Sequence, residues 1–158
     1  MRSDLLEQAK IELFLDVLRD AGRAQLRVAG NSMLPTLRGG DTIVVEAMRD
    51  TTVRPAEIVV FIQGGTFCTH RVLKSCGSHI ITQGDANRHP DLPVSNEECL
   101  ARVVAIERKG AQITALAARP ALSFIMRYSN LARKLFLWAT RNRGAGSARE
   151  LAGVTNSW

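Results

Sequence analysis

The sequence predicts a mainly β fold, in which an antiparallel β domain is preceded by one helix and followed by another. Three observations indicate this fold. Residues 3–21 repeat their apolar side chains at helical spacing. From Gln25 onward, short β-branched runs alternate with Gly, Pro and Asn and no helical stretch separates them, which is typical of antiparallel sheets. Beyond Pro120 a helical, amphipathic pattern returns.

The length of the chain limits the number of domains. With 158 residues, 46% of them hydrophobic, it can bury one sizeable core. We therefore expect one compact domain with short additions. The predicted boundaries are an N-terminal helix over residues 1–22, a β domain over 23–118, a basic amphipathic helix over 119–144 and a flexible tail over 145–158.

Each expected element has a local reason. In the first helix Ser3 is placed to cap the N-terminus and Gly22 to end the helix. Pro120 suits the first position of the second helix, which we expect to run to Gly144. Between the helices, Lys109-Gly110 is typical of a hairpin turn. The strands are expected at residues 26–29, 42–46, 58–63, 67–74, 79–83, 100–108 and 112–116.

The net charge of +6 is concentrated in one segment. Residues 119–143 hold six basic side chains and no acidic one, so the remainder of the chain is neutral. This distribution argues against nucleic-acid binding by the β domain. On a helical wheel, residues 121–143 separate a broad apolar arc from Arg127, Arg133 and Lys134. Such a helix either packs its apolar arc on the β domain or makes peripheral contact with an anionic membrane.

Two further features concern the cellular compartment. Acidic and basic residues interrupt the N-terminal apolar pattern, and no other segment is long and apolar enough, so we expect no signal peptide and no transmembrane helix. Three cysteines cannot all pair, which favours free thiols in a reducing compartment. The expected location is therefore the cytoplasm or the periphery of a membrane.

The residues best suited to acid–base and nucleophilic chemistry lie in three short segments. Ser32 follows the turn Gly30-Asn31, His70 lies in Cys68-Thr69-His70-Arg71-Val72, and Asp85 and Asp91 stand six residues apart after Gly84. A serine hydroxyl needs a base to become a nucleophile, and imidazole is suited to take its proton. A carboxylate would then orient the imidazole and stabilise its cation. Asp85 and Asp91 are both candidates for that role.

These segments, in this order, resemble the signal peptidase I superfamily of serine peptidases, which also includes the S24-type enzymes. Ser32-Met33-Leu34-Pro35 is similar to the nucleophile segment of that superfamily, and His70-Arg71-Val72 resembles the endoplasmic-reticulum and archaeal type, where histidine replaces lysine. The similarity runs over residues 28–107. It departs from the family at Gly30, where bacterial relatives often carry a hydroxyl, and at Pro55-Ala56-Glu57, where Gly-Asp is usual.

The resemblance implies a function. The chain would be a serine endopeptidase with a Ser32, His70 and Asp85 or Asp91 centre, and the backbone N–H of Ser32 would serve the oxyanion hole. Met33 and Pro35 would shape the substrate pocket. The substrate would be an extended peptide or precursor protein that adds as a strand and is cut after small residues. No cofactor and no metal is expected.

Three alternatives remain open. Cys68, His70, Cys76 and His79 could form a zinc set, although their spacing fits no common zinc module. A self-cleaving repressor-type peptidase of the same superfamily would use a Ser-Lys dyad, for which Lys74 is the nearest lysine. Finally, the fold could serve as a peptide-binding module without catalysis.

Overall fold

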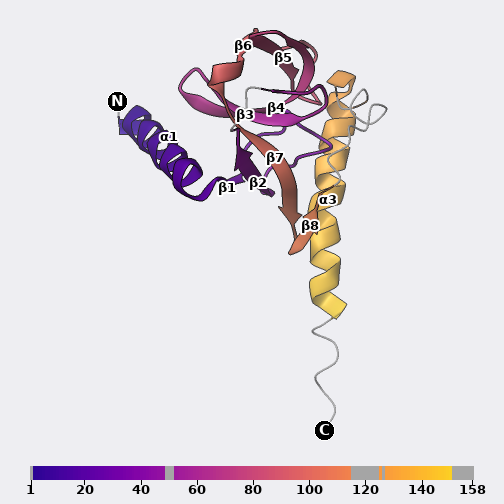
Figure 1. The fold of residues 1–158 in the computed structure, drawn as a ribbon. Coiled ribbons are helices and arrows are strands. Elements are labelled where there is room, and N and C mark those ends of the chain that lie inside the picture. Colours follow the sequence, from indigo (N-terminus) through magenta and orange to yellow (C-terminus); the bar gives the residue numbers. More distant parts are fainter. Residues whose placement is uncertain (1, 49–51, 115–124, 126, 151–158) are drawn as a thin grey trace.

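The computed structural model describes residues 2–48, 52–114, 125 and 127–150, and it confirms the predicted fold class. An eight-stranded antiparallel sheet lies between helix α1 (Arg2–Ala21) and helix α3 (Asn130–Glu150) along the chain. Figure 1 shows the two helices on opposite sides of the sheet.

The sheet brings together strands that are distant in sequence. Its order is β1-β2-β7-β3-β4-β5-β6, and β8 pairs with β7. β7 therefore joins the first hairpin to the strands that follow. A short 3-10 helix, Asn96–Glu98, leads into β7. The strands are β1 (Arg23–Arg27), β2 (Thr42–Ala47), β3 (Ile58–Gln63), β4 (Thr66–Cys76), β5 (His79–Gln83), β6 (Val94–Ser95), β7 (Cys99–Arg108) and β8 (Ala111–Ile113).

Strands β3 and β5 have the predicted limits, whereas β1 does not. β1 begins at Arg23, three residues earlier than expected, because it pairs with β2 from the Arg23–Glu46 register onward and an ion pair joins these two side chains. β6 was not predicted, since two residues carry too little pattern to be recognised. β8 ends at Ile113, and residues 115–116 of the predicted strand lie outside the described part.

Two apolar clusters form the core. The first joins Phe14 and Leu18 of α1 to buried side chains of β2, β3 and β7, such as Val45, Val60 and Val103. The second lies between β3, β4 and β5 and includes Phe61. Phe14 also stacks edge-on against Phe67 of β4, with ring centroids 4.8 Å apart. These contacts fix α1 to the sheet.

Helix α3 differs from the prediction at its C-terminal end. It continues to Glu150, so the end expected at Gly144 is wrong and residues 145–150, expected in a flexible tail, are helical. Alanine and arginine are strong helix formers and offset the cost of single glycines there. The predicted start at Pro120 lies outside the described residues. Phe136 and Leu137 pack against Leu34 and Ala86, which places α3 beside the loops of the β domain.

None of the helices in the described part of the chain is long and apolar enough to cross a membrane. Cys68, Cys76 and Cys99 are free thiols, as expected from their odd number.

Candidate active site

Two loops meet around Ser32. The first, between β1 and β2, carries Ser32 and a cis peptide bond between Leu34 and Pro35. The second follows β5, and its Ala86 N–H donates to the Ser32 carbonyl at 2.7 Å. A Cβ on Gly84 would lie 2.7 Å from that same carbonyl oxygen. Glycine at position 84 therefore allows the aspartate-bearing loop to approach the serine loop.

Ser32, His70 and Asp91 form a continuous chain of polar contacts. Ser32 Oγ lies 3.0 Å from His70 Nε2, and His70 Nδ1 lies 2.6 Å from Asp91 Oδ2. An ionised carboxylate can only accept, so Nδ1–H donates to Asp91 and Nε2 is left to accept the Ser32 hydroxyl proton. The His70 and Asp91 side chains are only 7% and 12% exposed. This is the arrangement that a serine nucleophile with a histidine base requires.

Neighbouring side chains hold His70 and Asp91 in place. Thr82 of β5 donates its hydroxyl to Asp91 Oδ2 at 2.7 Å. Phe61, fully buried in β3, presents its ring edge-on to the imidazole at a centroid distance of 6.2 Å. A rigid strand on each side thus limits the movement of the imidazole, which favours a fixed geometry for proton transfer.

Asp85, the other candidate carboxylate, contacts a different partner. Its two oxygens accept from Arg71 Nε at 2.8 Å and Arg71 Nη2 at 2.9 Å. Both side chains are only 6% exposed. Asp85 also accepts from the Thr36 hydroxyl at 2.5 Å. The two aspartates therefore have different partners, with Asp91 beside His70 and Asp85 beside Arg71.

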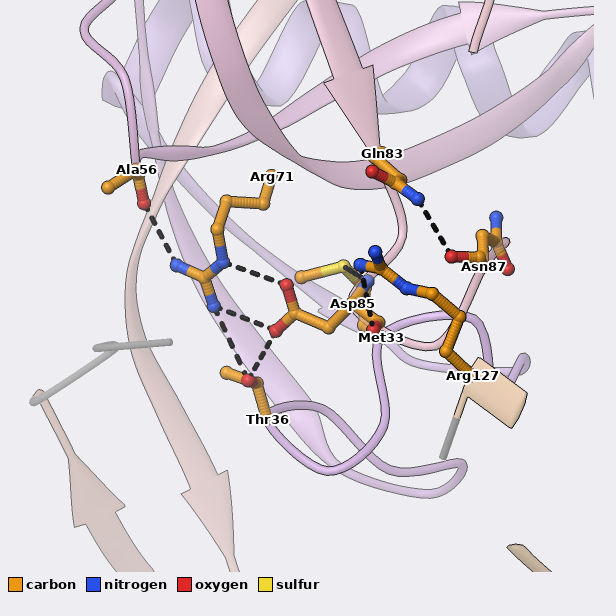
Figure 2. Close-up of polar contacts among 8 residues, drawn as sticks. All are labelled: Met33, Thr36, Ala56, Arg71, Gln83, Asp85, Asn87 and Arg127. Carbon is orange, nitrogen blue, oxygen red and sulfur yellow. Dashed lines mark hydrogen bonds and ion pairs between the residues drawn. The ribbon is translucent and has the colours of Figure 1, made fainter. Parts of the chain in front are cut away.

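Arg71 connects three segments of the domain, as Figure 2 shows. Besides Asp85, it contacts Thr36 in the serine loop and donates to the Ala56 carbonyl at 2.9 Å. Sequence reasoning missed this arginine. The available signal was the presence of two carboxylates in one loop, because a second buried carboxylate needs a cationic partner. Arg71 follows His70 in a strand, so alternation directs it away from the imidazole.

Cys68 lies close to the imidazole but is poorly suited to be a nucleophile. Its sulfur is 3.5 Å from His70 Nδ1. Burial, aided by the negative charge of Asp91, raises the pKa of the Cys68 thiol to about 11. A thiol that stays protonated at neutral pH is a weak nucleophile and a weak metal ligand.

The zinc alternative has no geometric support. Cys76 and His79 face each other at the far end of the β4–β5 hairpin, six or more residues along β4 from Cys68 and His70. At about 3.3 Å per residue, the two pairs are roughly 20 Å apart. Within the described residues, no group of three or more Cys, His, Asp or Glu side chains is arranged to hold a metal.

The remaining predicted residues fall into two groups. Lys74 is exposed and pairs in register with Ile81, and no contact joins it to Ser32 among the described residues. Met33 is buried beside Ser32, and its sulfur accepts the Asp85 backbone N–H at 3.4 Å. Pro35 is buried in the same loop. The part of Met33 and Pro35 in substrate binding stays a prediction.

A groove of about 760 Å³ opens beside Ser32 and Met33. One wall is formed by α1, including Leu13 and Phe14. The others are residues 24–30, which span β1 and the segment after it, and residues 66–69, the start of β4. Sequence reasoning gave α1 no part in the site, because a helical pattern does not reveal which strands the helix will lie across.

Comparison with known proteins identifies the family of this chain. No curated protein matches the sequence. The sequence profile described as Peptidase S24-like matches residues 5–104, a range that covers most of α1, the serine loop, His70, both aspartates and most of β7. That family contains serine peptidases, both signal peptidase-like and self-cleaving repressor types, together with non-catalytic members. The chain therefore belongs to the Peptidase S24-like family.

Proposed function

We propose that the chain is a serine endopeptidase of the signal peptidase type with a Ser32-His70-Asp91 centre. The observation that carries the proposal is the unbroken contact from Ser32 Oγ through the imidazole to Asp91, at 3.0 and 2.6 Å. The groove that opens beside the serine supplies room for a substrate.

The proposed reaction uses His70 as the proton carrier. Ser32 Oγ attacks the scissile carbonyl carbon while Nε2 takes its proton, and the Ser32 backbone N–H stabilises the oxyanion. Nε2 then returns the proton to the leaving amine as the C–N bond breaks, which leaves an acyl-serine. A water molecule, deprotonated by the same nitrogen, hydrolyses this ester and frees the enzyme. Asp91 holds the tautomer and stabilises the imidazolium throughout.

The groove supports an extended peptide as the substrate. β1 is the first strand of the sheet, and residues 66–70 of β4 pair only with β3 among the described strands. Each strand therefore offers an unpaired edge to the groove, to which a peptide can add. We propose cleavage of leader or signal-like peptides after small residues. The alternatives are self-cleavage in the manner of a repressor, and peptide binding without catalysis.

Cleavage mapping tests this proposal. The full chain and its Ser32→Ala variant are each incubated with a peptide library from a digested proteome, and the new termini are identified by mass spectrometry. We expect termini that appear only with the native chain, with small residues at the first and third positions before the cut. If the two proteins give the same termini, the peptidase proposal is wrong; a shortened native chain would indicate self-cleavage instead.

We also propose that α3 contacts an anionic membrane surface. Opposite the face that packs Phe136 on the β domain, α3 exposes a stripe of Leu131, Leu135 and Trp138. Basic residues, including Lys134, are not balanced by any acidic residue between positions 119 and 143. An exposed apolar stripe with cations beside it is suited to the interface of anionic lipids.

Vesicle co-sedimentation tests the membrane contact. We expect the full chain to pellet with anionic vesicles, to stay in solution with neutral ones, and to lose binding as salt increases, since each cation near the surface contributes about 1 kcal/mol. A Leu131→Glu, Trp138→Glu double variant should lose this binding. The matched control, Leu5→Glu with Leu6→Glu, changes two exposed apolar residues of α1 instead. Equal binding by both double variants, or none by the native chain, would contradict the proposal.

A further inference from the structure

We infer that α1 forms one side of the substrate groove and determines specificity. It selects peptides with large apolar side chains several residues before the cut. This inference rests on the proposed peptidase function and extends it to the part of the substrate remote from Ser32. It assigns a specificity role to Leu13, Phe14 and Val17, which lie outside the loops that carry the catalytic groups.

In the proposed complex, the peptide runs parallel to two strand edges. β1 runs from Arg23 toward the turn that precedes Ser32, and β4 runs from Thr66 toward His70. Both edges thus lead along the chain to the catalytic groups. A peptide paired in parallel with them brings its carboxyl-terminal part to Ser32 and leaves its earlier residues beside the beginnings of the two strands.

Spacing places those earlier residues against α1. At about 3.3 Å per residue, Phe67 lies about three peptide positions back from His70 along β4, and Leu26 lies six residues before Ser32. Side chains roughly four to six positions before the cut therefore lie at or just beyond these two residues. Both residues line the groove. Phe67 is also the residue on which Phe14 of α1 stacks. The helix therefore covers the groove where these upstream residues would lie.

The exposure pattern of α1 fits a binding surface rather than a purely structural helix. Phe14 and Leu18 are buried and fix the helix to the core. Leu13 is 66% exposed and Val17 41% exposed, yet both border the groove. Exposed apolar side chains gathered at a groove mark a place where an apolar ligand is covered. The polar pair Glu7 and Lys10 lines the groove too, and forms an ion pair at 2.6 Å.

The matching substrate is therefore an extended peptide with two regions. Small residues lie directly before the cut, as the resemblance to signal peptidases implies, and bulky aliphatic residues lie roughly four to six positions before it. Burial of one aliphatic side chain against Leu13 and Val17 is expected to change affinity by about tenfold.

The test uses two synthetic peptides with alanine at the first and third positions before the cut. One carries leucine at the fourth, fifth and sixth positions and the other carries serine there. Binding to the Ser32→Ala chain is measured by fluorescence polarisation, and cleavage by the native chain is measured by mass spectrometry. We expect the leucine peptide to bind, and to be cleaved, about tenfold better.

Two variants of α1 test whether this helix causes the preference for the leucine peptide. Leu13→Asp should remove the preference for the leucine peptide. Leu6→Asp changes a residue of the same helix that is 59% exposed but does not line the groove, so it should leave the preference intact. Because both positions are exposed, neither change is expected to unfold the chain.

Each result separates the two proposals. Equal binding and cleavage of both peptides, or equal behaviour of Leu13→Asp and Leu6→Asp, would show that α1 does not determine substrate preference. The proposed peptidase function would stand in that case. If the leucine peptide binds preferentially but is not cut, the groove assignment stands and the peptidase function fails. If neither peptide binds, the inference is wrong. A shortened native chain in the same mass spectrum would show that its own segment occupies the groove, which also overturns it.

Discussion

Replacement of Ser32 by alanine is expected to lower kcat for peptide cleavage by at least about 10³-fold, and His70→Ala by a similar factor. The hydroxyl and the imidazole act as one unit, since Ser32 Oγ lies 3.0 Å from Nε2, the atom placed to take its proton. The double variant should therefore be no slower than either single one. Single-turnover cleavage of the best library peptide provides the measurement.

The chain offers a matched control for this pair. Ser78 and His79 also form a serine–histidine contact, at 2.8 Å, but both are exposed, Ser78 in the β4–β5 turn and His79 at the start of β5. Ser78→Ala and His79→Ala should leave cleavage unchanged. Lys74→Ala should do the same, because Lys74 makes no contact with Ser32 within the described structure. Loss of activity in Lys74→Ala with retention in His70→Ala would replace the proposed centre by a Ser-Lys dyad.

The β domain could be predicted from the sequence because its strands are bounded by strong turn residues. β3 and β5 were found with their observed limits, since Pro55, Gly64, Gly77 and Gly84 delimit the β-branched runs. The predicted start of β1 is three residues too late because Arg23, Ala24 and Gln25 lack β-branched side chains. Only their pairing with β2 makes them part of a strand. Local pattern cannot supply that information.

The candidate site was predictable in its residue types but not in its connections. Ser32 and His70 stand out because their chemistry is needed and their segments resemble a known family. Asp85 and Asp91 could not be separated, because both lie in one loop and either could reach an imidazole. Their partners, Arg71 and His70, are adjacent in a strand and face opposite ways, and only the folded sheet shows which loop residue meets which.

The second large effect concerns stability and separates the two aspartates. Asp85→Ala leaves the Arg71 guanidinium buried without its carboxylate, which is expected to cost about 3–5 kcal/mol of unfolding free energy. For a domain of this size that corresponds to a fall in Tm of roughly 10 °C. Asp91→Ala should instead lower kcat by roughly 10³–10⁴-fold, because the imidazole loses the group that orients it. Urea unfolding and single-turnover kinetics measure the two effects on the same proteins.

A double substitution shows whether the stability effect belongs to the ion pair. Arg71→Met with Asp85→Leu replaces both charges by apolar groups of similar volume, so neither is left buried alone. Its loss of stability should be clearly smaller than the sum of the losses in Arg71→Met and Asp85→Leu taken singly. Thr36, which donates to Asp85, would still lose that partner, so some cost remains. An Asp85→Ala chain as stable as the native one but inactive would show that Asp85 acts in the chemistry. The assignment of Asp91 as the sole orienting carboxylate would then be wrong.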